Sequence, residues 1–151
     1  MKTRVWPAAF LVAAACGGDA NVEGNYTMAV TNGENGCTIA NWTVGQQSTN
    51  IPVTVRQEGG DVSAEVGGVA GIGLGLLLSQ NLFTGSVDGD DIDLKIIGST
   101  SFKSGECSYT YTADLRGTLE GDALSGDILY RAERNGHPDC AAIEGCISVK
   151  K

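Results

Sequence analysis

The sequence is poor in basic residues and contains a single histidine. Its 151 residues include 10 lysines and arginines against 18 aspartates and glutamates, so the formal net charge is −8. Proteins that bind nucleic acid need a basic face to displace the counterions of the phosphate backbone. We therefore expect no nucleic-acid partner.

Catalytic motifs are missing as well. The sequence contains no GxSxG, HExxH or P-loop motif. A serine or cysteine nucleophile needs a base beside it, and the only histidine, His137, lies in a turn-forming Asn-Gly-His-Pro string near the C-terminus. The acidic residues fall in expected turns or on outward strand positions instead of facing each other across a cleft. These absences predict a protein that is not an enzyme and uses no cofactor.

The N-terminal segment combines a short basic start with an apolar run. Lys2 and Arg4 precede an almost wholly apolar run from Trp6 to Ala15. A run of about ten residues is too short to cross a bilayer core of about 30 Å as a helix. It is typical of the apolar region of a signal peptide.

The residues that end this run, Ala13-Ala14-Ala15-Cys16, resemble the lipobox of bacterial lipoproteins. In that family the cysteine thiol receives a diacylglyceryl group, the chain is cut just before it, and the new amino group is acylated. The resemblance implies that residues 1–15 are a signal peptide, that Cys16 is lipidated and that residues 16–23 form a lipid-anchored linker. Gly17 replaces the aspartate associated with inner-membrane retention, which implies the outer membrane. Ala13 stands where the family usually has leucine, and Ala13 with Ala15 also fits ordinary secretory cleavage.

Four further cysteines fit an exported protein. They are Cys37, Cys107, Cys140 and Cys146. An even number in a small exported chain predicts two disulfides, in any of three pairings. Zinc is the alternative, because His137 lies close to Cys140. A CxxC motif and a second histidine are missing, however, so we expect no metal centre.

The remaining chain, residues 24–151, shows apolar residues at alternate positions in eight places. Such alternation predicts strands with one buried face, and short glycine-containing turns between them predict antiparallel neighbours. The expected strands contain Tyr26–Val30, Ala40–Val44, Ile51–Val55, Val62–Val66, Phe83–Val87, Ile92–Ile96, Tyr109–Leu115 and Leu124–Tyr130. Eight sequential strands predict an all-β, up-and-down meander that forms a barrel or, alternatively, a two-sheet sandwich. This layout resembles lipocalin-like proteins, without any shared motif.

One apolar stretch departs from the alternation. Its leucines and glycines, between residues 67 and 82, predict a short helix or helical loop near 71–79 that covers one end of the barrel. It either completes the core or presents an apolar lid, partner surface or membrane-dipping segment.

The turns between strands are rich in acidic residues. In an up-and-down meander, the turns of Glu58–Asp61, Asp88–Asp91 and Glu120–Asp122 fall at the same end of the barrel. Carboxylates from flexible loops are ligands that calcium prefers. Asp88, Asp90 and Asp91 are therefore weak calcium candidates, although their spacing is not that of an EF-hand.

An eight-stranded interior is filled by its own side chains or holds one small ligand. The inward aromatic residues Trp42, Tyr109 and Tyr111 are candidate ligand contacts, with Leu74 and Leu76 in the gate. The sequence thus predicts a lipid-anchored envelope protein of the outer membrane with a structural or interaction role. The alternative is a carrier of a small apolar ligand or lipid.

Overall fold

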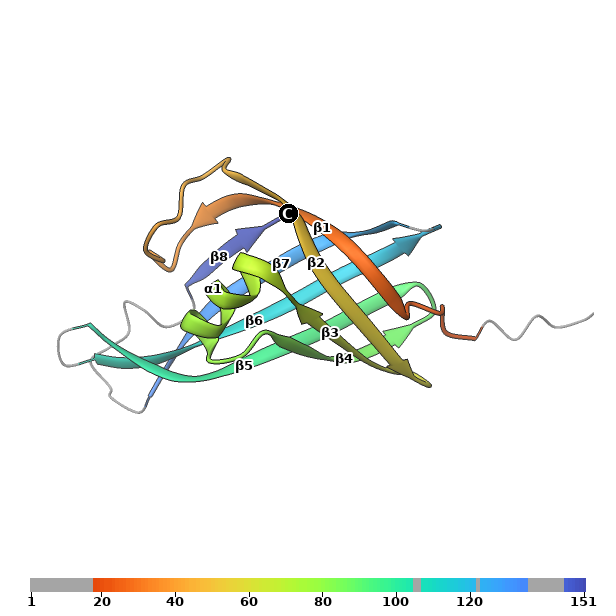
Figure 1. Cartoon of the computed structure of the whole chain (residues 1–151). Helices are drawn as coiled ribbons and strands as arrows, with labels where there is room; N and C mark the ends of the chain where they lie inside the picture. Colours follow the sequence, from red (N-terminus) through yellow and green to blue (C-terminus); the bar gives the residue numbers. More distant parts are fainter. Residues whose placement is uncertain (1–17, 105–106, 122, 136–145) are drawn as a thin grey trace, which may run out of the picture.

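The structure is a computed structural model that describes residues 18–104, 107–121, 123–135 and 146–151. Eight strands and one helix make up this part of the chain. They are β1 (Gly24–Asn35), β2 (Gln47–Glu58), β3 (Asp61–Val66), α1 (Gly68–Leu78), β4 (Leu82–Asp88), β5 (Asp91–Ser104), β6 (Cys107–Glu120), β7 (Ala123–Arg134) and β8 (Ile147–Lys150). The strands form one closed antiparallel barrel in the order of the sequence. The predicted up-and-down barrel is confirmed, and the sandwich is not formed (Figure 1).

The predicted alternation fixes the two faces of the sheet. Ile92, Leu94 and Ile96 of β5 are buried, whereas the residues between them are exposed. Inward residues of the neighbouring strands meet them in the core, as Leu94 does opposite Leu115. The hydrophobic effect therefore selects this register, since a shift by one residue would turn the apolar set outward.

The three acidic turns lie together at one end of the barrel, as expected from the topology. They connect β2 to β3, β4 to β5 and β6 to β7, and Gly59, Gly89 and Gly121 supply the positive φ that these turns require. The N-terminal chain arrives at this same end (Figure 1). We call it the acidic end.

Part of the predicted linker, residues 16–23, packs on the acidic end. The N–H of Ala20 donates a hydrogen bond to the carbonyl oxygen of Gly89, at 2.8 Å. The N–H of Val22 donates to Gln57, and the Val22 side chain is buried in the core. From residue 20 onward, the chain is therefore held by the barrel.

One predicted strand is wrong and one strand was missed. Ala40–Val44 belongs to the loop between β1 and β2, where Thr38, Asn41 and Gly45 all have positive φ. Three such residues within eight positions break the extended backbone of a regular strand, whereas β2 accommodates a single one, Asn50, at a bulge. The eighth strand is instead β8, whose four residues give too short an alternation to be recognised.

The predicted helix is confirmed as α1. It forms despite its glycines because Leu74 and Leu78 are buried against the barrel, and because Gly71 packs on the backbone of Val66 so closely that a side chain would not fit. α1 connects the ends of β3 and β4 that are remote from the acidic end (Figure 1).

Candidate ligand-binding cavity

The short strand β8 closes only part of the barrel. It pairs with β7 over Ile128–Arg131, and its partners in β1 begin at Asn32. One further backbone pair joins Thr31 to Lys151, at 2.7 and 3.0 Å. Within the described residues, positions 24–30 of β1 and 123–127 of β7 are paired only on their other sides, with β2 and β6. We call the opening between these two segments the slit.

A cavity of about 560 Å³ lies behind the slit, in the half of the barrel nearer the acidic end. Its aliphatic lining consists of Val22, Met28, Ala29, Val30, Val53, Val55, Val62, Ala64, Ile92, Leu94, Leu115, Leu119, Ala123, Leu124 and Ile128. The polar and charged residues that complete the lining are Tyr26, Thr27, Arg116, Ser125, Asp127, Lys150 and Lys151. Cavities of this size and character commonly bind small molecules. The arrangement can therefore exclude water from an apolar ligand that enters from the side.

Glycines in the barrel wall help to leave this space empty. Gly117 and Gly126 face each other across β6 and β7 and line the cavity. A side chain at Gly126 would collide with the backbone of Gly117 and Arg116. The close approach of the two strands thus requires glycine at Gly126, and the same absence of side chains leaves room inside.

One charged side chain points into the barrel beside the cavity. Lys150 lies opposite Ile128 in the register of β7 and β8, and directly opposed residues share a face of the sheet. Its Nζ is 5.1 Å from the centre of the Trp42 ring, which is a cation–π distance. Burial lowers the pKa of the Lys150 ammonium below its usual value.

Trp42 itself is held from two sides. Its indole N–H donates to the carbonyl oxygen of Gly33 at 2.9 Å, and its ring meets Tyr130 edge to face with 5.7 Å between ring centres. Burial raises the pKa of the Tyr130 hydroxyl above its usual value. These contacts hold the Trp42 ring against the Lys150 ammonium. Trp42 is not among the residues that line the cavity.

The other residues predicted to contact a ligand also lie outside this lining. Tyr109 and Tyr111 form an aromatic cluster with Phe102, and the Tyr111 hydroxyl donates to the carbonyl oxygen of Cys37 at 3.4 Å. Burial and the neighbouring Tyr109 raise the pKa of Tyr111 to about 12. Leu74 is buried under α1, whereas Leu76 is exposed on its outer side. These residues fill or cover the opposite half of the barrel.

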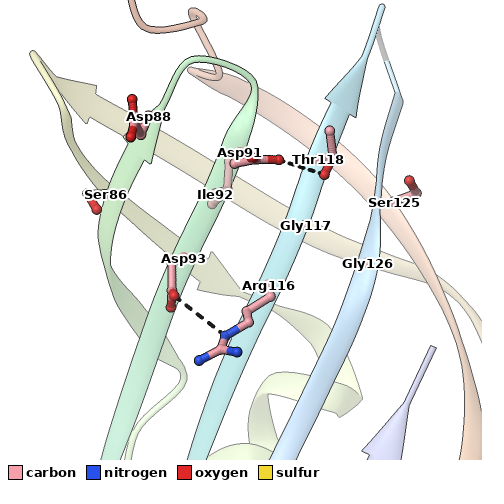
Figure 2. Close-up of a pocket in the computed structure, with 10 residues that line it drawn as sticks. All are labelled: Ser86, Asp88, Asp91, Ile92, Asp93, Arg116, Gly117, Thr118, Ser125 and Gly126. Atoms are coloured by element: carbon pink, nitrogen blue, oxygen red, sulfur yellow. Dashed lines mark hydrogen bonds and ion pairs between the residues drawn. The ribbon is translucent and has the colours of Figure 1, made fainter.

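A second hollow, of about 500 Å³, lies on the outer face of strands β4 to β7 (Figure 2). Four of its polar side chains are paired with each other across the strands. Thr118 donates to Asp91 at 2.8 Å, and Arg116 lies 3.5 Å from Asp93. Because these groups already have partners on an open, solvated surface, the inner cavity is the better candidate site.

Two of the three calcium candidates, Asp88 and Asp91, line this outer hollow together with Asp93, whereas Asp90 lies in the β4–β5 turn and is exposed. Within the described ranges of the chain, no three His, Cys, Asp or Glu residues come close enough to hold a metal ion.

Two of the predicted cysteines form a disulfide. Cys37, in the β1–β2 loop, is bonded to Cys146, just before β8, with 4.9 Å between their Cα atoms. Cys140 lies outside the described residues, as do Cys16, His137 and the side chain of Cys107. The second disulfide and the lipid anchor therefore stay predictions.

Sequence reasoning missed the residues that matter most here. Lys150 alternates with buried Ser148, so its inward direction follows from a period of two once β8 is recognised. No local sequence pattern predicts the slit, because it arises from the difference in length between β8 and its neighbours β1 and β7.

The chain shows no significant match to known protein families, to curated proteins or to solved structures. In the part of the chain that the structure describes, α1 is too short to cross a membrane, and no other helix is present.

Proposed function

We propose that this protein binds a small apolar ligand inside its barrel while Cys16 anchors it in the cell envelope, at the outer membrane. The observation that carries the proposal is the aliphatic cavity of about 560 Å³ behind the slit. Burying apolar surface contributes about 25 cal/mol per Å² before the costs of association. A lateral opening supports ligand exchange without unfolding of the barrel ends.

The position of the N-terminal chain supports the anchoring part of the proposal. Residues 18–22 run along the acidic end, and Val22 lines the cavity. A lipid on Cys16 would keep this end near the membrane. The cavity would then lie close to a source of apolar molecules.

A neutral fluorescent probe tests the binding proposal. N-phenyl-1-naphthylamine should become fluorescent on addition of the purified protein, and Ala64→Leu, which fills the cavity wall, should weaken this binding. Ala132→Leu is the matched control, because Ala132 is equally buried but does not line the cavity. Circular dichroism verifies that both variants fold. Unchanged probe binding by folded Ala64→Leu would contradict the proposal. It would also be contradicted if the probe did not bind and native mass spectrometry of the purified protein showed no bound ligand.

The outer side of α1 favours a second function, an interaction role in the envelope. Val69, Ile72 and Leu76 are 88, 66 and 76% exposed, and their spacing places them on one side of the helix. Exposed apolar stripes of this kind mark interaction surfaces. A photo-crosslinker at Ile72 should then capture a specific envelope protein in intact cells, whereas one at Thr54, on the outer side of β2, should not.

A further inference from the structure

The charged residues around the cavity differ in whether they already have a partner. Arg116 lies 3.5 Å from Asp93, so a carboxylate offsets its charge. Lys150 takes part in none of the ion pairs formed by the described residues, which involve Lys95, Arg116 and Arg131. An inward lysine without an anion is unusual in so acidic a chain.

Among the described residues, no neighbour of Lys150 is an anion paired with it. Its register partners are Asn32 of β1, a buried neutral amide, and Ile128 of β7, which is apolar, while Trp42 offers its ring face. Asp127 lines the same cavity but forms no ion pair with Lys150. Ser148, the next inward residue of β8, is already used, since it donates to Asn35 and accepts from the N–H of Cys37. Lys151 follows at the rim of the same cavity and is exposed.

We infer that the ligand is an amphiphile with a single acyl chain and an anionic head group, whose head binds the Lys150 ammonium while the chain fills the aliphatic half of the barrel. This inference rests on the proposed function and adds the chemical class of the ligand. Carboxylate and phosphate oxygens both form charge-assisted hydrogen bonds to an ammonium group. The lowered pKa of Lys150 agrees with it, because an anion at this place would offset the cost of burying the charge.

The slit explains why one chain is expected. The cavity opens through the slit between β1 and β7. Lys150 and Lys151 lie where β8 closes this slit. A chain can therefore lie along the slit and inside the barrel while its head remains at β8. Wider lipids with several chains would exceed a volume of about 560 Å³.

Binding of three probes tests the inference, using the full chain with Cys16→Ser so that no acyl group of its own competes. The probes are palmitate, 1-palmitoyl lysophosphatidic acid and 1-hexadecanol, which share the chain length and differ in head group. We expect palmitate or the lysophosphatidic acid to bind about tenfold or more tightly than the alcohol, as a charge-assisted hydrogen bond allows. The tighter of the two anions identifies the head group.

Variants then assign this preference to one residue. Lys150→Gln should lose the preference for anions but keep the binding of 1-hexadecanol, which also shows that its cavity is intact. Lys150→Arg should retain the preference. Lys103→Gln, an exposed lysine on β5, is the matched control and should behave like the parent.

Two results would overturn the inference in distinguishable ways. Equal binding of all three probes, unchanged by Lys150→Gln, would remove the anionic head group but leave an apolar binding site. Failure of every probe to bind would remove the proposed function together with the inference.

Discussion

Cys37 is bonded to Cys146, a residue 109 positions further along the chain. The bond joins the loop after β1 to the residue that precedes β8. It therefore holds the shortest strand of the barrel beside one of its two neighbours. Because β8 provides Lys150 and limits the slit, this covalent link also positions the candidate site.

Removal of this bond should lower the stability of the barrel. A disulfide that closes a loop of this length contributes about 2–5 kcal/mol, mainly by restricting the unfolded chain. We expect Cys37→Ala/Cys146→Ala to unfold at a lower urea concentration than the parent protein. The double variant Cys107→Ser/Cys140→Ser separates this effect from that of the predicted second disulfide. An unchanged midpoint for Cys37→Ala/Cys146→Ala would contradict the pairing.

Lys150 should make the stability of the ligand-free protein depend on pH. Its pKa is lowered in the folded state, so between that value and the ordinary value of about 10.4 the unfolded chain binds more protons. The free energy of unfolding therefore rises with pH in this window as Lys150 loses its proton. At pH values below the window, the buried charge destabilises the folded protein to its full extent. We expect Lys150→Met to be more stable than the parent at pH 7, with the difference shrinking as pH approaches 10.

Urea unfolding at pH 7, 9 and 10.5 measures this difference. Lys103→Met, which removes an exposed lysine, is the control and should show a constant difference from the parent across the same range. A constant difference for Lys150→Met as well would show that its ammonium is not destabilised by burial.

The sequence revealed the barrel because most strands carry their own pattern. Ile92, Leu94 and Ile96 alternate with polar residues for long enough to define a strand, and glycine-containing turns define its neighbours. Trp42 was misplaced because alternation alone does not exclude positive φ at Asn41. The cavity could not be predicted, since it depends on how far β8 reaches along β1 and β7, and no residue encodes that locally.

Asp114 should be the most important acidic residue for folding on the outer face of β6. Its side chain is buried between two cations, Lys95 at 3.6 Å and Arg131, which forms a hydrogen-bonded ion pair with it. Asp114→Asn leaves these groups without their anion, which should cost about 1–3 kcal/mol of unfolding free energy. Asp93→Asn is the matched control, because its pair with Arg116 is exposed and should contribute less than about 1 kcal/mol. Equal losses for the two variants would show that burial does not strengthen the Asp114 network.

Two glycine substitutions should have opposite effects. Gly126→Ala places a methyl group against the backbone of β6 and should destabilise the barrel. Gly75 of α1 has no atom within 4 Å of an added Cβ, so Gly75→Ala should stabilise the protein by about 0.5–1 kcal/mol through helix propensity. Thermal unfolding compares the two. A stabilising Gly126→Ala would show that β6 and β7 do not approach each other as closely as the structure indicates.

The lipid anchor predicts where the protein is found in the cell. Cys16→Ser removes the thiol that would carry the diacylglyceryl group, so the protein should no longer float with outer-membrane vesicles in a density gradient. The intact mass of the parent should exceed that of residues 16–151 by the mass that the diacylglyceryl group on the thiol and the acyl group on the new amine add. Cys107→Ser, which removes a cysteine outside the lipobox-like segment, is the matched control and should stay with the membrane. Because a single acyl chain gives only reversible membrane binding whereas several give stable attachment, persistence of Cys16→Ser in the membrane fraction would mean that something other than a lipid holds the acidic end there.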